Sequence, residues 1–191
     1  MNSGLISSRY TTSLLQYAID LGQQEEVYAR MKLLTEMFSE VPKLNNVILN
    51  PSLPLQEKKK VILTACGGNV PSSLDKMIDL ILKNEREESM QYIALRFIDQ
   101  YREKYNIQYG QLITAVGIDK ETEKRLITRI ESIVGGKIEL EPVVDHGIIG
   151  GFVLHLGDYR WDASVSGELT RIRSKFKSLQ VNSVTRREHV R

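Results

Sequence analysis

Apolar side chains recur at helical spacing from residue 3 to about residue 106, and the breaks fall at turn-forming positions such as Gly22, Pro42 and Gly67-Gly68. Pro54 and Pro71 fit the first turns of two further helices, where a missing N–H costs little. The pattern predicts six helices joined by short loops, which implies a compact helical bundle over residues 1–106. The expected helices span residues 3–20, 23–40, 43–49, 54–66, 71–84 and 89–106.

The pattern changes after Asn106, where alternating apolar and polar residues indicate strands. Asp119 is the expected N-cap of an amphipathic helix through Val134, and a last helix is expected to begin near Ser164. Its stripe would hold Val165, Leu169, Ile172, Phe176 and Leu179. The expected strands cover residues 111–116, 138–141, 152–156 and 159–162, the last two as a hairpin turning at Gly157-Asp158.

The predicted fold class is therefore mainly α: an N-terminal six-helix bundle followed by a small α+β domain with the order strand, helix, strand, hairpin strand, helix. The second domain is expected over residues 107–179. Residues 180–191 show no useful periodicity and are expected to form a flexible tail.

Composition narrows the function classes. The chain has 191 residues, 41% hydrophobic and 26% charged, which are ordinary values for a soluble globular protein. A net charge of +2 is too small to predict a nucleic-acid footprint, although the segment from Arg160 onward holds 8 basic against 3 acidic residues. This excess either favours an acidic helical partner or is a solvated face. No signal or transit sequence and no membrane-spanning run is apparent, so we expect membrane contact only through partners.

A search for chemistry gives no catalytic, metal or cofactor site. The glycine pairs at 67–68, 135–136 and 150–151 lack the Lys-Ser/Thr element of a P-loop, and Gly135-Gly136 fits a helix C-cap. His146 and His155 lack metal-ligand spacing. The single cysteine, Cys66, cannot form an internal disulfide and suits a reducing cytosol. We therefore expect no enzymatic activity, no cofactor and no metal.

Two helices of the first domain carry more apolar surface than packing on one side requires. In helix 3–20, Leu5, Leu15 and Ile19 lie roughly opposite a stripe that contains Tyr10 and Tyr17. Apolar residues also cover more than half of helix 71–84. Either these helices are central and buried on every side, or one face of each lines a groove for an amphipathic helix.

The stretch from Ile138 to Leu169 resembles the C-terminal signature of the ATP synthase delta subunit family, which includes the mitochondrial oligomycin-sensitivity-conferring protein. Ala163, Ser166 and Trp161 depart from the usual residues. The similarity in order and size of elements extends over essentially the whole chain, from Arg9-Tyr10 onward. The matching positions are Ile138, Leu140, Val144-Asp145, Ile148, Gly150-Gly151-Phe152, Leu154-His155, Gly157, Asp162, Ser164-Val165, Gly167 and Leu169.

Physical chemistry gives these signature positions structural roles. We expect Gly150 and Gly151 to allow a bulge or close backbone approach, and Asp162 with Ser164 to cap the last helix. Gly167 costs about 1 kcal/mol inside a helix relative to alanine and is expected to permit close packing. Asp145 and Gly157 complete the predicted structural set.

The resemblance implies a peripheral-stalk subunit of the rotary proton-translocating ATP synthase, which resists rotor torque and is not an enzyme. It implies that the first domain binds the N-terminal helix of the headpiece α subunit between its first and fifth helices, and that the second domain binds the stator b subunits. It places the chain at the cytoplasmic face of the bacterial inner membrane, with the isolated chain expected to be monomeric. The candidate groove residues are Leu5, Leu15, Ile19, Met77, Leu80 and Ile81, and the candidate b-subunit contacts are Leu169, Ile172 and Phe176.

One alternative from another class is a small two-domain nucleic-acid-binding protein. It would need a basic sheet face that carries aromatic side chains, and Tyr159, Arg160 and Trp161 are the candidates for it.

Overall fold

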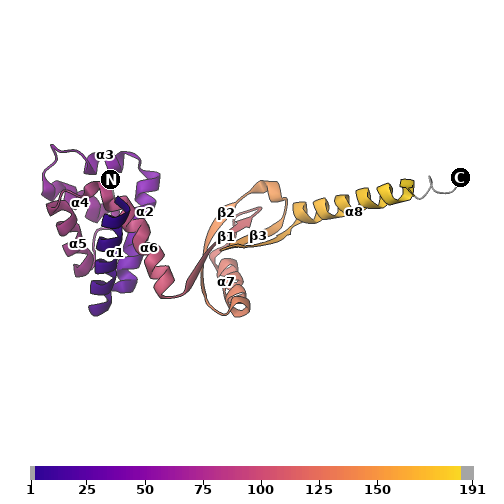
Figure 1. Cartoon of the computed structure of the whole chain (residues 1–191), viewed down its shortest axis with the longest axis horizontal. Coiled ribbons are helices and arrows are strands. Elements are labelled where there is room, and N and C mark those ends of the chain that lie inside the picture. The colour runs from indigo at the N-terminus through magenta and orange to yellow at the C-terminus, as the bar shows by residue number, and fades with distance from the viewer. Residues whose placement is uncertain (1–2, 186–191) are drawn as a thin grey trace. The chain divides into compact units, whose positions relative to one another are not determined.

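The computed structural model describes residues 3–185, and the side chains of residues 4–176. The chain divides into two compact units, of which the described parts are residues 3–105 (unit 1) and 106–185 (unit 2). The first is helical, and the second combines helices with a small sheet (Figure 1). The prediction of a mainly helical chain with a small sheet in its C-terminal part is confirmed.

The core of unit 1 is formed where α6 packs against both α1 and α2, with α5 packing against α1 and α4. Leu14, Met31, Ile78, Ile93 and Phe97 are almost completely buried there. The elements are α1 (Ser3–Asp20), α2 (Gln24–Glu40), α3 (Lys43–Ile48), α4 (Leu55–Ala65), α5 (Ser72–Lys83), the 3-10 turn η1 (Glu87–Ser89) and α6 (Met90–Lys104).

Glycine and proline residues mark the boundaries of three of these helices. Gly22 has a φ of +66°, and after it the N–H of Gln23 donates to the carbonyl of Ala18 at 2.8 Å, which closes α1. Pro54 and Pro71 stand directly before α4 and α5, with φ of −58° and −60°. Each fixes the backbone where the helix begins.

Two lysines of α4 form ion pairs with neighbouring elements of unit 1. Lys58 Nζ lies 2.6 Å from Glu87 Oε1, and both side chains are nearly buried, with 7% and 11% exposure. Lys59 Nζ lies 2.9 Å from Asp75 Oδ1 and 2.8 Å from Asp79 Oδ1 on α5. The first pair joins α4 to η1, and the second joins α4 to α5.

In the described part of unit 2, four strands form one sheet in the order β2-β1-β3-β4. The β1–β2 pair is parallel and connected through α7, while β1–β3 and β3–β4 are antiparallel. The elements are β1 (Ile107–Thr114), α7 (Lys120–Val134), β2 (Lys137–Val144), the 3-10 turn η2 (His146–Ile148), β3 (Gly151–Leu156), β4 (Tyr159–Ser164) and α8 (Val165–Thr185).

The core of unit 2 lies between α7 and one face of the sheet. Ile130 of α7 packs with Leu112, Ile138, Leu140, Leu154 and Leu156. Asp119 caps α7, because its carboxylate accepts a hydrogen bond from Thr122 N at 2.7 Å, and Gly135 in the left-handed region ends it. Both caps agree with the sequence analysis.

Several boundaries differ from the predicted ones. β1 begins at Ile107 rather than residue 111, because residues 107–110 pair in parallel register with residues 137–140 of β2. Gly110 also permits a close approach to β3, since a Cβ there would lie 2.2 Å from the carbonyl oxygen of His155. β2 runs on through Pro142 to Val144, which an edge strand tolerates. Val153 lies on the opposite face of β3 from Leu154, and both side chains are buried.

α8 continues to Thr185 and so enters the segment 180–191, for which a flexible tail is predicted. Residues 186–191 lie outside the described residues, and the side chain of Leu179, placed on the apolar stripe of this helix, lies outside the described side chains.

Candidate partner-binding interfaces

The edge where α1 meets α5 is bridged by two hydrogen bonds that tyrosine hydroxyls of α1 accept. Lys76 Nζ donates to Tyr17 Oη at 2.9 Å, and Asn84 Nδ2 donates to Tyr10 Oη at 3.0 Å. Because the residue numbers rise on α1 as they fall on α5, the two helices run antiparallel. We call this edge the α1–α5 seam and define it by Tyr10, Tyr17, Lys76, Leu80 and Asn84.

Leu80 lies between the two bridges of the seam. At about 100° per residue, Lys76, Leu80 and Asn84 share one side of α5. Leu80 is 46% exposed, so the seam carries an open apolar position bordered by two aromatic rings. Lys76 Nζ also lies 5.6 Å from the centre of the Tyr17 ring, and its hydrogen bond with the hydroxyl raises the pKa of Lys76.

The structure brings only part of the predicted groove set to this seam. Met77 and Leu80 lie on the side of α5 that faces α1, although Met77 is 8% exposed and can contribute only a floor. Ile81, at 1% exposure, is a core residue. Of the three candidate residues on α5, Leu80 is therefore the one that is exposed at the seam.

The three candidates from α1 lie on the wrong side of that helix for the seam. Leu5, Leu15 and Ile19 are roughly opposite Tyr10 and Tyr17. Their neighbour Thr12 forms a hydrogen bond with Gln100 on α6, which identifies this side as the α1–α6 edge. Leu15 is buried there, while Leu5 is 59% exposed.

Sequence reasoning missed the tyrosines because it grouped them with the core stripe of α1. One signal was available. A tyrosine in an otherwise apolar stripe needs a partner for its hydroxyl, and therefore favours the border of a core over its centre.

The second candidate interface is the exposed apolar stripe on α8. Leu169, Ile172 and Phe176 are 43%, 44% and 65% exposed, and Val165 at the start of the helix is 42% exposed. Among the described residues, β4 and η2 are the elements with the most extensive packing against α8. The alternating spacing of four and three residues matches the seam of a two-helix coiled coil. The three predicted contact residues therefore share an open face.

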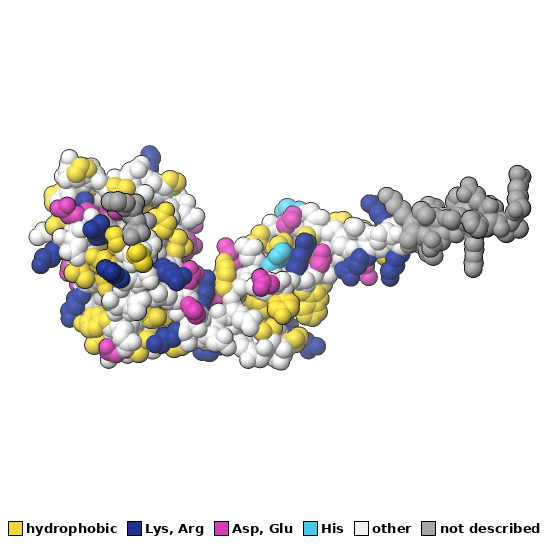
Figure 2. Space-filling view, in the orientation of Figure 1, with side chains coloured by type: hydrophobic (Ala, Val, Ile, Leu, Met, Phe, Trp, Pro, Cys, Tyr) yellow, Lys and Arg dark blue, Asp and Glu magenta, His cyan; other side chains and the backbone are white. Residues whose placement is uncertain are grey.

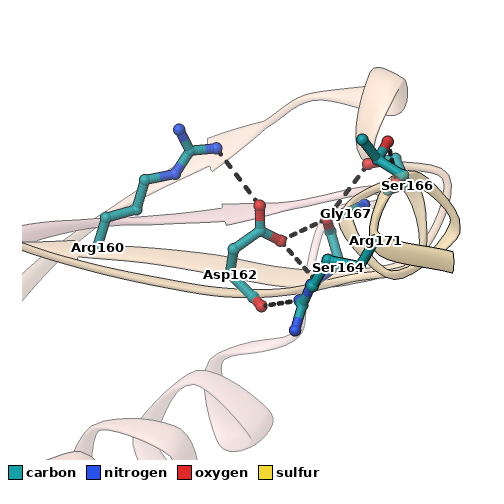
Figure 3. A network of polar contacts seen from close by, with 7 residues as sticks. Arg160, Asp162, Ser164, Ser166, Gly167 and Arg171 are labelled. Atoms are coloured by element: carbon teal, nitrogen blue, oxygen red, sulfur yellow. Dashed lines mark hydrogen bonds and ion pairs between the residues drawn. The ribbon is translucent and has the colours of Figure 1, made fainter. Parts of the chain in front are cut away.

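The N-terminus of α8 is held by the signature residues (Figure 3). Ser164 Oγ accepts a hydrogen bond from Gly167 N at 3.0 Å and donates to Asp162 Oδ1 at 2.6 Å. Arg171 donates to the carbonyl oxygen of Asp162 at 2.9 Å. Ser164 is the direct cap, and Asp162 fixes its orientation, with a pKa lowered by the hydrogen bond from Ser164.

Glycines let the chain close around this network. A Cβ on Gly167 would lie 2.7 Å from Asp162 Oδ1, so the space beside this helical glycine is occupied by the carboxylate. Gly151 has a φ of +74°, and a Cβ there would lie 2.2 Å from the carbonyl oxygen of Ala163 on β4. Gly150 accepts a hydrogen bond from Val165 N at 3.0 Å, which joins this turn to α8.

The remaining signature residues also shape the backbone. Asp145 accepts a hydrogen bond from Gly147 N at 2.8 Å and so caps η2. Gly157, with a φ of +55°, stands in the turn between β3 and β4.

Reactive groups are few among the described residues. No cluster of three or more metal-ligating side chains occurs in residues 3–185, and no helix in that range is long and apolar enough to span a bilayer. Burial raises the pKa of the Cys66 thiol to about 12, which disfavours the reactive thiolate.

The candidates for nucleic-acid binding are divided between two faces of the sheet. Tyr159 and Trp161 pair with Leu156 and Leu154, so they share the side that α7 covers. Arg160 is on the other side. That side also carries the carboxylate of Glu141, which accepts hydrogen bonds from Tyr109 and Gln111. A basic aromatic platform is not formed, and this alternative is not favoured.

Two units that each expose apolar positions on a helix define a protein of the binding class, one that holds other chains together. Comparison with known proteins specifies this class further. The family profile described as ATP synthase delta (OSCP) subunit matches residues 6–176.

Relatives named ATP synthase subunit delta include a protein of Bacteroides thetaiotaomicron, 38% identical over 92% of this chain and 96% of the relative. Another, from Bacteroides fragilis, is 39% identical over the same shares. A chain in the cryo-EM structure of the Toxoplasma gondii mitochondrial ATP synthase hexamer shares the fold, with a TM-score of 0.60 at 18% identity over 89% of this chain and 96% of that chain.

The chain belongs to the ATP synthase delta (OSCP) subunit family. It is a non-catalytic stator subunit of the ATP synthase. The family and the function inferred from the C-terminal signature are thereby confirmed.

Proposed function

We propose that this subunit links the catalytic headpiece to the membrane-anchored stator by binding one helix on each unit. Unit 1 receives the N-terminal helix of the α subunit along the α1–α5 seam. Unit 2 binds the b subunits through the stripe of Leu169, Ile172 and Phe176. The subunit acts as a monomer at the cytoplasmic face of the bacterial inner membrane.

The observation that carries this proposal is that each unit leaves apolar side chains exposed on a helix, one leucine at the seam of unit 1 and a stripe at helix spacing on α8. Leu80 stands open between two hydroxyl bridges, and Phe176 is 65% exposed. Burying one such side chain stabilises a complex by about 1.5–3 kcal/mol. Resisting rotor torque requires such affinity at two ends of one chain and requires no chemical step.

Leu5, Leu15 and Ile19 are retained only as a second possible edge of the headpiece contact, because they border α6 rather than α5. The two edges make different predictions. Binding along the seam depends on Leu80, whereas binding along the α1–α6 edge depends on Leu5.

The headpiece contact is tested by titrating the full chain with a synthetic peptide of the cognate α-subunit N-terminus in a calorimeter. Leu80→Asp should abolish binding, because it places a charge in the apolar contact. Val47→Asp on α3 is a matched control, since Val47 is 40% exposed in the same unit, and should bind like the wild type. Loss of binding by Leu5→Asp with retention by Leu80→Asp would reject the seam.

The stator contact is tested with the soluble part of the cognate b subunits in the same way. Phe176→Asp should weaken binding at least about tenfold, which corresponds to about 1.4 kcal/mol. Val116→Asp in the loop after β1, where Val116 is 66% exposed, serves as the control. Equal binding by both variants would reject α8 as the contact.

A further inference from the structure

The acidic and the basic side chains of α5 lie on different sides of the helix. Its exposed strip holds Asp75, Lys76, Asp79 and Lys83. Both carboxylates point to α4, where Lys59 Nζ lies 2.9 Å from Asp75 Oδ1 and 2.8 Å from Asp79 Oδ1. One ammonium group therefore pairs with both acids on the side away from α1, so the three groups together carry one negative charge.

The two lysines of the strip lie on the side of the seam. In the described part of the chain, the hydrogen bond and the ring contact of Lys76 are both with Tyr17, which is neutral. Within the described residues, neither Lys76 nor Lys83 forms an ion pair. They are seven residues apart, which separates their positions by about 10 Å along the helix, and Leu80 lies between them.

Across the seam, α1 adds no net charge. Its exposed charged side chains are Arg9 and Asp20, of which Asp20 accepts a hydrogen bond from Gln16 at 2.9 Å. The lysines of α5 therefore set the sign of the potential beside Leu80. On the face drawn in Figure 2, dark-blue basic side chains lie among yellow hydrophobic ones over unit 1.

We propose that the α1–α5 seam selects an acidic amphipathic helix and fixes its register through Lys76 and Lys83. The partner places an apolar side chain on Leu80 and a carboxylate beside each lysine, so its two acids are about seven residues apart on one face. This inference rests on the proposed function and specifies the chemistry of the headpiece helix. Exposed charge pairs contribute mainly to encounter rate, orientation and choice of partner, which is the purpose of this arrangement.

The test is a binding matrix measured by calorimetry with the full chain at about 50 and about 300 mM NaCl, where screening differs strongly. One probe is the synthetic α-subunit N-terminal peptide, and the other is the same peptide with its Asp and Glu replaced by Asn and Gln. The proteins are the wild type, the double variant Lys76→Gln/Lys83→Gln, and the control Lys120→Gln/Lys124→Gln on α7, which changes the net charge equally.

At low salt the seam variant should bind the acidic peptide about threefold to tenfold more weakly than the wild type, the range of two exposed ion pairs. That difference should shrink at high salt. The amide peptide should bind the wild type and the seam variant equally, and the α7 control should behave as the wild type.

Wild-type-like binding of the acidic peptide by the seam variant, with Leu80→Asp still abolishing it, would overturn the charge inference and leave the proposed function intact. An equal loss in the α7 control would overturn it too, because net charge would then be the cause. Absence of any binding by the wild type would remove the proposed headpiece contact and this inference together.

Discussion

The two units are stabilised in different ways. Unit 1 buries many side chains between helices. Lysines with long, flexible side chains, such as Lys58 and Lys59, form ion pairs between its elements. Unit 2 has a smaller core and closes through backbone approaches at Gly110 and Gly151 that leave no room for a Cβ. Side chains can repack, whereas a paired strand cannot shift without losing its hydrogen bonds. Unit 2 should therefore be the more sensitive to small changes at single positions.

The largest expected effect is for Gly151→Val. The valine would be forced into a positive φ and its Cβ against the carbonyl oxygen of Ala163, so β3 and β4 would have to separate. We expect a loss of about 4 kcal/mol or more in the stability of unit 2. The chain's only tryptophan, Trp161, lies on β4, so thermal melting followed by its fluorescence reports this unit.

Gly117→Ala is the control for that measurement, because a Cβ at Gly117 meets nothing within 4 Å. Its melting curve should match that of the wild type. An unchanged melting temperature for Gly151→Val would contradict the view that backbone approach governs unit 2.

Glu87→Ala should have the largest effect in unit 1. Removing this carboxylate leaves the Lys58 ammonium nearly buried without its partner, which costs about 3 kcal/mol. Urea unfolding followed by circular dichroism measures the loss. Lys60→Ala, which breaks the exposed pair with Glu57, should change stability by less than about 0.5 kcal/mol, and similar losses in both variants would show that burial is not the decisive factor.

Gly167→Ala sets two smaller effects against each other. Alanine favours the helix by about 1 kcal/mol, but its Cβ displaces the Asp162 carboxylate that orients the cap, and we expect a net loss of about 1 kcal/mol. In the background of Asp162→Ala the same substitution should become stabilising. Trp161 fluorescence melts of the four proteins measure this coupling, and a loss of equal size in both backgrounds would exclude it.

The smallest expected effect is a dependence of the stability of unit 2 on pH in the acidic range. The backbone hydrogen bond from Thr122 lowers the pKa of Asp119, and the side-chain hydrogen bond from Ser164 lowers that of Asp162. Both groups bind protons more readily in the unfolded chain, so their contribution is present above the ordinary pKa of 3.8 and is lost as pH falls below it. Melting temperatures should therefore fall less steeply below that pH for Asp119→Asn/Asp162→Asn than for Asp158→Asn.

Local signals were enough to predict most elements. The local sequence predicts the Asp119 cap, the helix end at Gly135 and the hairpin at Gly157, because caps and turns depend on side chains only a few positions apart. The signature from Ile138 to Leu169 likewise identified the family, since its residues shape one continuous stretch of backbone.

Tertiary structure decided which sides of the helices face which neighbours. α1 has apolar residues on two opposite sides, and its periodicity does not say which of them faces α5. The sequence therefore predicts Leu5, Leu15 and Ile19 at the edge where the structure places Tyr10 and Tyr17. The early start of β1 likewise depends on its parallel pairing with β2, in which Ile107 lies opposite Lys137. Contacts between residues distant in sequence leave no local pattern. The sequence by itself therefore determined the elements and the family. Only the tertiary structure determined which side chains line the α1–α5 seam.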